Sequence, residues 1–467
     1  MHSILSRRLA AALAACLLPA AAFAASKDAA IPADISAKSL EMLKRSVSFK
    51  TVKDEGQVPA YAEYLAGELK AAGFAPEDIT ITPMGETATL TAVYHGSDPK
   101  LKPILVASHM DVVSAKREDW ERDPFTPVVE NGFLFGRGSA DNKFGLVTSM
   151  TAIFWLKKEG FKPKRDIVIV LSGDEETSQT TTAKLAERLK GAELLLNSDA
   201  GGAYLGDDGK PTVYSMQAAE KTYMDFEVTT TNPGGHSSRP GPTNAIADLA
   251  RAIDKVAAFR FPARLSELTK AYFKAAGPIT PGKSGEMMLR YADNPEDKEA
   301  YGYLHDQPEY VGQLGTTCVP TMLRGGHAPN ALPQSATVNI NCRVFPGESV
   351  ESVQSTLAKA IDDPKAQVKL VSHPVPSDAS PLRDDVMKAL RKAIDLRAPG
   401  LPIVPSMSAG ATDSLYFRNL GVPSYGVGGI FMHVKDSFAH GLNERIPVAS
   451  IDGAVIQWRS IVRDLSR

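Results

Sequence analysis

The chain has 467 residues, too many for one ordinary domain and suited to about two or three. Its 43% hydrophobic and 23% charged residues are typical of a globular protein with a self-sufficient core. A formal net charge of -2 argues against non-specific binding to nucleic acid or to an anionic membrane.

The first residues read as an export signal. Arg7 and Arg8 precede an apolar stretch over residues 9–21, and Ala22-Phe23-Ala24 forms a small-x-small cleavage site. The apolar stretch is too short to span a bilayer, and no other segment is long and apolar enough to do so. We therefore expect residues 1–24 to be a signal peptide and the mature protein to be secreted or periplasmic. Lipoprotein anchoring at Cys16 is the alternative.

The first half of the mature chain alternates between helical and strand patterns. Helical spacing predicts helices over residues 39–47, 58–72 and 141–158. Apolar and alternating runs predict strands over residues 79–82, 89–94, 104–107, 167–171 and 193–196. This alternation predicts an α/β sheet with helices on both faces.

The pattern changes near residue 221. Strands are predicted at 223–230, 317–323, 336–345 and 367–371, with helices at 244–257 and 350–361. This order is typical of a small α+β sandwich, placed at 219–374 and inserted into a first domain of residues 25–218 and 375–467. The strand 223–230 is expected at an exposed edge, and residues 262–315 are expected to be irregular. Cys318 and Cys342 either form a disulfide or remain two buried thiols.

Polar residues follow several predicted strands at the point where each strand ends. His109 follows one buried strand, Glu175 and Glu176 follow another, and Asp199 follows a third, while Asp141 opens a helix. Ligands bind at the carboxyl ends of strands in open α/β sheets, so these side chains should converge. One histidine with several carboxylates suits a divalent metal. A lone histidine would more often be structural, and a lone Glu-Glu pair would more often be a solvated loop. The prediction of a metal site therefore depends on finding such residues at the ends of several neighbouring strands.

These runs carry a family resemblance. The sequence resembles the co-catalytic zinc family of carboxypeptidase G, aminoacylase-1, succinyl-diaminopimelate desuccinylase and carnosinase over nearly the whole mature chain. Residues 316–346 are most similar to the branch of vacuolar carboxypeptidase S and the secreted N-acyl-amino-acid hydrolases. The resemblance is carried by residues 108–113, Trp120, 123–125, 136–138, 141–143, 174–176, 233–238, 325–326, 330–333 and 440–444.

The resemblance implies a zinc-exopeptidase-like mixed sheet with an inserted ferredoxin-like lid or dimerisation domain. It also implies two divalent ions, zinc first and cobalt or manganese as alternatives. His109 and Asp199 would hold one ion, Glu176 and His440 the other, and Asp141 would bridge them. Two such ions lie about 3.5–4 Å apart and lower the pKa of a shared water.

Other roles carried over from the family concern catalysis. Asp111 would accept a hydrogen bond from the imidazole of His109 and fix its tautomer. Glu175, beside a ligand, would be the general base. His236 in the inserted domain would donate to the oxyanion, and in several relatives it does so across a homodimer. His433 competes with His440 as the last ligand, but only His440 is followed by the family's Asn-Glu pair.

The resemblance also implies substrate contacts. Asn330 and Arg343 match substrate-holding positions, and a guanidinium suits a carboxylate. The loop containing Gly410 and Thr412 resembles one whose backbone amides receive a terminal carboxylate. Many carboxypeptidase G-like members carry Glu where this chain has Asp199. The segment 262–315 is longer than in the simplest relatives, which leaves the dimer geometry and the pocket shape open.

The resulting function is a secreted di-zinc hydrolase that cleaves an amide or peptide bond next to a free carboxylate, as a carboxypeptidase or dipeptidase-type exopeptidase. Its partners would be small peptides or N-acyl-amino acids, not nucleic acid. An N-acyl-amino-acid hydrolase or an aminopeptidase is the alternative within enzymes. An inactive binding protein of the same fold is the alternative outside them, but every proposed ligand and the base are present.

Overall fold

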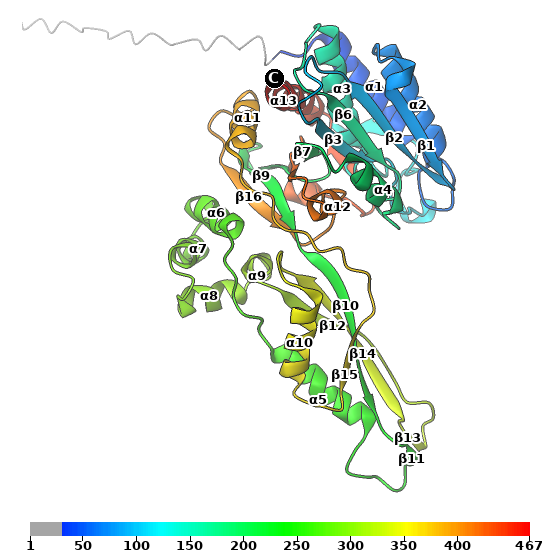
Figure 1. Cartoon of the computed structure of the whole chain (residues 1–467), viewed down its shortest axis with the longest axis vertical. Helices are drawn as coiled ribbons and strands as arrows, with labels where there is room; N and C mark the ends of the chain where they lie inside the picture. The colour runs from blue at the N-terminus through cyan, green and yellow to red at the C-terminus, as the bar shows by residue number, and fades with distance from the viewer. Residues whose placement is uncertain (1–29) are drawn as a thin grey trace, which may run out of the picture.

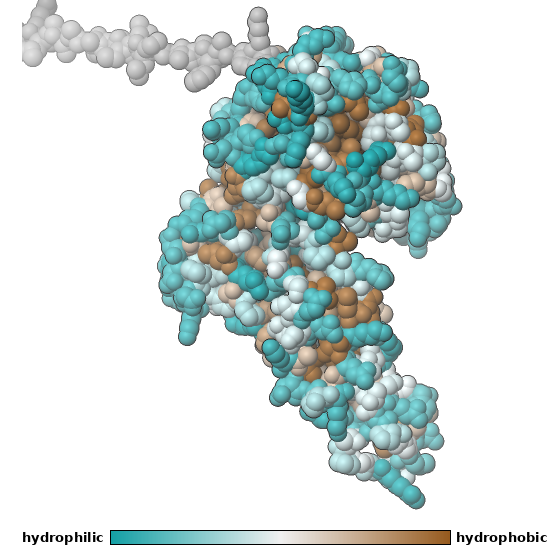
Figure 2. All heavy atoms as spheres, in the orientation of Figure 1, coloured by the Kyte–Doolittle hydropathy of each residue, from teal (hydrophilic) through white to brown (hydrophobic). Residues whose placement is uncertain are grey.

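The computed structural model describes residues 30–467, which form a large upper body and a narrower lower one (Figure 1). The predicted signal peptide and Cys16 lie outside the described residues. Within residues 30–467, no helix has the length and apolar character needed to cross a membrane. Figure 2 shows hydrophilic residues over most of the visible upper body, and a notch between the two bodies on the right.

A mixed ten-stranded sheet forms the centre of the upper body. Its order is β1-β2-β6-β3-β7-β17-β9-β8-β18, and β16 also pairs with β9. The strands β6, β3, β7 and β17 are parallel to one another, whereas β1 and β2 run antiparallel to their neighbours. The strand β9 is antiparallel to β17 and β8 and parallel to β16. The strands are β1 (Ile79–Met84), β2 (Thr87–Tyr94), β3 (Ile104–His109), β6 (Ile167–Ser172), β7 (Leu194–Asn197), β8 (Gly202–Leu205), β9 (Pro211–Glu220), β16 (Ile403–Ser408), β17 (Ser424–Gly426) and β18 (Phe431–His433).

Helices cover both faces of this sheet, as the alternation of elements predicts. Ile104 and Val106 of β3 belong to the core under one set of helices, and Leu105 and Ala107 belong to the core on the opposite face. The first set is α1 (Ala33–Val47), α2 (Val58–Ala71), α3 (Lys143–Lys158), α11 (Asp384–Asp395) and α13 (Ala449–Leu465); the second is α4 (Thr180–Leu189) and α12 (Ser414–Asn419). A strand buried on both faces explains the continuous apolar run.

The lower body contains the predicted strand-helix-strand-strand-helix-strand unit. Its elements are β10 (Thr222–Thr231), α5 (Ala245–Ala258), β12 (Thr317–Gly325), β14 (Ser335–Val344), α10 (Val350–Ile361) and β15 (Gln367–Leu370). The sheet order is β12-β14-β10-β15, the ferredoxin-like arrangement. The expectation that residues 223–230 form an edge strand is wrong, because β10 is paired on both sides. The edges are β12 and β15.

The exposed edge strand β12 has an apolar surface. Val319, Met322 and Leu323 are 55%, 73% and 68% exposed. Cys318 of β12 forms a disulfide with Cys342 directly opposite it on β14. This pairing selects the disulfide from the two alternatives and ties the edge strand to its neighbour.

The prediction of irregular structure over 262–315 is wrong. The segment forms four short helices, α6 (Glu267–Ala276), α7 (Lys283–Asp293), α8 (Lys298–His305) and α9 (Pro308–Leu314). Their apolar faces share a core with Val404 of β16, with Val213 of β9 packed against it. Gln313 Nε2 also donates to the carbonyl oxygen of Met407, at 2.9 Å. These helices are therefore anchored on the large sheet, although they interrupt the sequence of the lower unit.

A buried lysine lies where the chain passes from β9 to β10. Lys221 is 2% exposed, and its Nζ lies 3.4 Å from Thr317 Oγ1, with no carboxylate of residues 30–467 within ion-pair distance. Burial, reinforced by the charge of Arg343 and opposed by that of Glu348, lowers the pKa of Lys221 to about 7.

We expect this lysine to make stability depend on pH. The unfolded chain holds the proton up to about pH 10.4, whereas the folded chain releases it near pH 7, so the folded state gains stability as pH rises above 7. Relative to Lys221→Met, the free energy of unfolding of the wild type should rise by up to about 1.4 kcal/mol per pH unit between about pH 7 and 9. Urea unfolding at several pH values measures this. The exposed Lys359→Met variant is the control and should track the wild type.

Candidate metal centre

Three neighbouring parallel strands end at one edge of the large sheet. The strand β3 ends at His109, β6 ends just before the turn that carries Glu175 and Glu176, and β7 ends just before Asp199. Asp141 precedes α3, and His440 lies in the loop after β18. His109, Asp141, Glu175, Glu176 and Asp199 meet at this edge, as the strand-end pattern predicts. His440, which the family resemblance implies, meets them there.

Asp141 lies between the two histidines. Its Oδ1 is 2.9 Å from His109 Nε2, and its Oδ2 is 3.1 Å from His440 Nε2. Asp199 Oδ1 is 3.4 Å from His109 Nε2, and Glu176 Oε1 is 2.8 Å from His440 Nε2. One carboxylate thus faces two histidines, each of which also faces a second carboxylate.

The donor set fits divalent cations. The ligand atoms of His109, Asp141 and Glu176 lie within 4.8 Å of one another, as do those of His109, Glu175 and Asp199. Imidazole nitrogens with carboxylate oxygens are the donors found in catalytic zinc sites. The close packing of several carboxylates is electrostatically costly unless cations compensate it. The residues present therefore fit a metal centre.

The ionisation of these groups reflects their crowding. Burial raises the pKa of Glu175 and of Asp199 well above the ordinary range of a carboxyl group. Burial opposes charge on His109, but the carboxylates of Asp199, Asp111 and Asp141 raise its pKa well above its usual value. Hydrogen bonds that the imidazole of His440 donates to the carboxylates of Asp141 and Glu176 raise the pKa of His440 to about 10. These pKa shifts share one cause, the burial of several carboxylates beside two histidines.

The expected contact of Asp111 with His109 needs correction. His109 Nδ1 is 3.0 Å from the main-chain oxygen of Asp111 but 3.6 Å from its carboxylate. The carboxylate instead accepts from the backbone N–H groups of Glu175 and Glu176, at 3.1 and 3.0 Å. Asp111 therefore orients the imidazole through its backbone and the Glu175-Glu176 turn through its side chain.

The segment before Asp141 is held by a buried carboxylate that was recognised only as part of a motif. Glu444 is fully buried and accepts from the backbone N–H groups of Gly138, Ala140 and Asp141 at 3.0, 2.7 and 3.0 Å. The guanidinium of Arg137 donates to it at 2.6 Å. These four bonds fix the backbone that presents Asp141. The sequence does not predict that the Gly136-Arg137-Gly138 run contacts Glu444.

Glu175 faces a cavity between the two bodies. Gln179 Nε2 donates to Glu175 Oε1 at 3.1 Å, a contact that sequence reasoning missed. The cavity has a volume of about 370 Å³ and is lined from the other body by Tyr223 and Arg343. Arg343 donates to the carbonyl oxygen of Ala409 at 2.8 Å and lies over the Tyr223 ring at 4.8 Å. No carboxylate of residues 30–467 forms an ion pair with Arg343, so its guanidinium can bind a ligand.

The structure does not bring the remaining predicted substrate residues to this cavity. The backbone N–H of Gly410 donates to Ser408 Oγ at 3.0 Å, and the buried Thr412 hydroxyl donates to Glu220 Oε1. The neighbouring Ala411 lines the cavity instead. His236 of β11 (Gly235–His236) and Asn330, just before β13 (Ala331–Leu332), lie together at the far tip of the lower body (Figure 1).

His433, the competing ligand, ends β18 and forms no ion pair with a carboxylate of residues 30–467. His440 is the histidine that reaches Glu176 and Asp141.

A mixed sheet with converging carboxylates and histidines at its strand ends defines a metal-dependent hydrolase. Residues 105–464 match the model of Peptidase family M20/M25/M40, and the chain belongs to this family. It is a metal-dependent peptidase or amidohydrolase, which confirms the family inferred from the motifs.

Individual relatives lie in the inferred branch. The human N-fatty-acyl-amino acid synthase/hydrolase PM20D1 is 28% identical over 375 residues, covering 77% of this chain and 73% of that protein. Carboxypeptidase S of Saccharomyces cerevisiae is 32% identical over 281 residues, covering 56% of this chain and 49% of that protein. The M20 metallo-carboxypeptidase Sso-CP2 of Sulfolobus solfataricus shares the fold, with a TM-score of 0.66, 20% identity, and coverage of 91% and 98%.

Proposed function

We propose that this protein is a secreted di-zinc exopeptidase that hydrolyses an amide bond next to a free carboxylate, as a carboxypeptidase or dipeptidase. The observation that carries the proposal is the cavity between the two bodies, where Glu175 and Glu176 lie opposite Arg343. A bidentate guanidinium recognises a planar carboxylate, and no carboxylate of residues 30–467 forms an ion pair with Arg343. The carboxylate-bearing half of the substrate would lie here, with its amide bond at the metal centre.

His109, Asp199, Glu176, His440 and the bridging Asp141 would hold the two cations. Bound there, the cations would polarise the scissile carbonyl and lower the pKa of a water molecule. Glu175 would accept the proton of that water as it adds to the acyl carbon. After the C–N bond breaks, Glu175 would return the proton to the leaving amine. Its hydrogen bond from Gln179 would keep the carboxylate turned toward the cavity.

The oxyanion donor would come from a second copy of the chain. His236 is exposed at the tip of the lower body, far from the metal centre of its own chain (Figure 1). We propose that residues 219–374 form a lid and dimerisation domain inserted into a catalytic domain of 25–218 and 375–467. The exposed apolar residues of edge strand β12 suit pairing with a copy of themselves.

Hydrolysis of N-acyl-amino acids is the second candidate. These substrates carry the same free carboxylate, so Arg343 would serve them equally. The similarity to a protein named as an N-fatty-acyl-amino acid synthase/hydrolase favours this candidate.

Export is part of the proposal. Residues 1–24 would be removed as a signal peptide, with lipidation at Cys16 as the alternative. The disulfide between Cys318 and Cys342 supports an oxidising compartment, because cytosolic proteins rarely keep such bonds.

The requirement for a free carboxylate tests the proposal most directly. Purified zinc-loaded protein should hydrolyse dipeptides or N-acyl-amino acids, and C-terminal amidation of the same compounds should abolish the activity. Arg343→Ala should raise KM for the free acids, and Arg343→Lys should recover only part of the loss because a lysine cannot bind a carboxylate bidentately. Equal rates on acids and amides would contradict the proposal.

We also expect two divalent cations per chain. Chelation should abolish activity, and zinc, cobalt or manganese should restore it, because four carboxylates and two histidines converge there within the described chain. Metal analysis of active protein measures the stoichiometry. One tightly held ion in fully active enzyme is the contrary result.

A further inference from the structure

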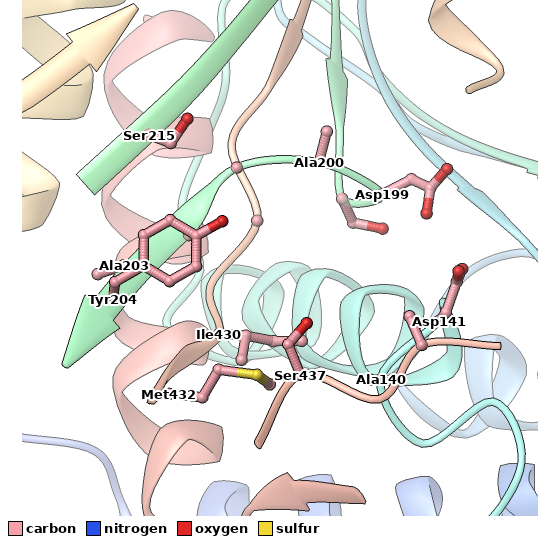
Figure 3. A pocket seen from close by; sticks show the side chains of 15 residues that line it. Ala140, Asp141, Asp199, Ala200, Ala203, Tyr204, Ser215, Ile430, Met432 and Ser437 are labelled. Atoms are coloured by element: carbon pink, nitrogen blue, oxygen red, sulfur yellow. The ribbon is translucent and has the colours of Figure 1, made fainter. Parts of the chain in front are cut away.

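A second cavity adjoins the metal centre from another side. It has a volume of about 250 Å³ and shares no lining residue with the cavity that contains Arg343. Figure 3 shows Asp141 and Asp199 at one side of it and Tyr204, Ile430 and Met432 at the other. One cavity therefore reaches the centre at Glu175 and Glu176, and the other reaches it at Asp141 and Asp199.

Cleavage of an amide divides a substrate into an amine half and an acyl half that leave the reacting carbon in different directions. The proposed function places the carboxylate-bearing amine half beside Arg343. The acyl half must then occupy the cavity beside Asp141 and Asp199. This assignment rests on the proposed function.

The lining of this cavity suits an uncharged group. None of its lining residues is Lys, Arg or His, and its only carboxylates are Asp141 and Asp199 of the metal centre. Two of its hydroxyl groups are already bonded within the protein. Ser198 Oγ bonds to Ser108 Oγ at 2.7 Å and to Asn142 Oδ1 at 3.0 Å, and Ser215 Oγ bonds to Ser406 Oγ at 2.9 Å. A charged acyl group would lose water here without gaining an ionic partner.

The shape of the cavity is set by close packing of β8 against β18. Part of its floor is backbone, since a Cβ added at Gly202 would lie 2.7 Å from the carbonyl oxygen of Ile430. Met432 pairs with Tyr204 across these strands, so their side chains line the far end together. Tyr204 is 45% exposed and stands at the border with solvent. An aliphatic chain can therefore pass Ile430 and Met432 and reach Tyr204.

We propose that this cavity is the acyl subsite and that it prefers an uncharged acyl chain to an acyl group with a free α-amino group, which favours the second candidate, N-acyl-amino acid hydrolysis, over dipeptidase activity. No carboxylate outside the metal centre lines the cavity to receive an ammonium group. Ile430, Met432 and Tyr204 set the preference for chain length, because they supply the apolar surface that the chain covers.

The test compares matched acyl groups on one amino acid with the metal-loaded enzyme. A leucyl group and a 4-methylpentanoyl group differ only by the α-amino group, and we expect kcat/KM to favour the latter at least tenfold. Along the series from acetyl to octanoyl, kcat/KM should rise about fourfold per methylene until the chain passes Tyr204. N-succinyl should be at least tenfold poorer than the similarly sized N-pentanoyl.

Tyr204→Ala should reduce the ratio of octanoyl to acetyl kcat/KM roughly tenfold. Tyr303, a partly buried tyrosine of α8 outside both cavities, provides the matched control Tyr303→Ala, which should keep the ratio. Calorimetry with the Glu175→Gln protein should show the same dependence of Kd on chain length without turnover.

The outcomes separate this proposal from the proposed function. Hydrolysis of the compounds with no dependence on acyl length, or a preference for the leucyl dipeptide, would overturn the acyl subsite alone. Lack of hydrolysis of every dipeptide and N-acyl-amino acid by protein with both cations bound would overturn the proposed function.

Discussion

Replacing Glu175 by Gln is expected to lower kcat by roughly 10²–10⁴-fold or more while metal content remains near that of the wild type. The amide keeps the size of the side chain and the contact with Gln179, but it cannot accept a proton. Kinetics and metal analysis on the same preparation measure both effects.

Glu176→Gln is the matched variant on the adjacent residue. Glu176 lies 2.8 Å from His440 Nε2, so its loss should lower metal occupancy, and excess zinc should recover part of the activity. A carboxylate oxygen of Glu175 also lies within 4.8 Å of the ligand atoms of His109 and Asp199, so Glu175 could itself hold a cation. Comparing the two variants decides which glutamate is the ligand and which is the base. If the Glu175 variant lost metal and the Glu176 variant kept it, Glu175 would be the ligand and Glu176 the base.

Replacing His236 by Ala should cost about 2.7–4 kcal/mol in the chemical step, as for other single oxyanion donors. Both cations should remain bound, because His236 lies at the tip of the lower body and every proposed ligand lies in the upper one. Single-turnover kinetics and metal analysis measure these two properties.

The position of His236 also predicts complementation. Mixing inactive Glu175→Gln chains with inactive His236→Ala chains should restore some activity, since a mixed dimer would contain one site with both residues intact. Met322→Glu places a charge on the apolar edge strand β12 and should prevent both dimerisation and rescue. If heterodimers are shown to form but activity is not restored, His236 acts in the site of its own chain or in no site.

The convergence of the side chains at the metal centre could be predicted from the sequence because most of them are placed by local features of the chain. His109, Glu176 and Asp199 each follow an apolar run, and parallel strands carry such residues to one edge whatever the rest of the fold does. Asp141 instead opens a helix, and His440 is implied by the family resemblance alone. The contacts that position the ligands were not predictable in this way. Glu444 reaches the segment before Asp141 from 303 residues away, and nothing in either segment specifies its partner.

Failures elsewhere have two physical origins. The alternating pattern of 223–230 shows that the strand has two different faces, but only long-range pairing decides that β10 lies inside the sheet. The helices α6–α9 are 7–11 residues long, so each offers few turns of periodic pattern. In α7 the buried Met287, Met288 and Tyr291 do follow helical spacing and could have revealed it.

The anchoring of α6–α9 on the large sheet has a mechanical consequence. The backbone passes between the upper body and the ferredoxin-like unit near residue 221, over 259–266, at 315–316 and over 371–380. A lid joined by its two ends alone could swing by changing a few backbone dihedrals at two points. In this chain four connections must bend together, so the ferredoxin-like unit should move through a narrow arc. The stiffness of that movement should depend on the contact between α9 and β16, where Gln313 bonds to Met407.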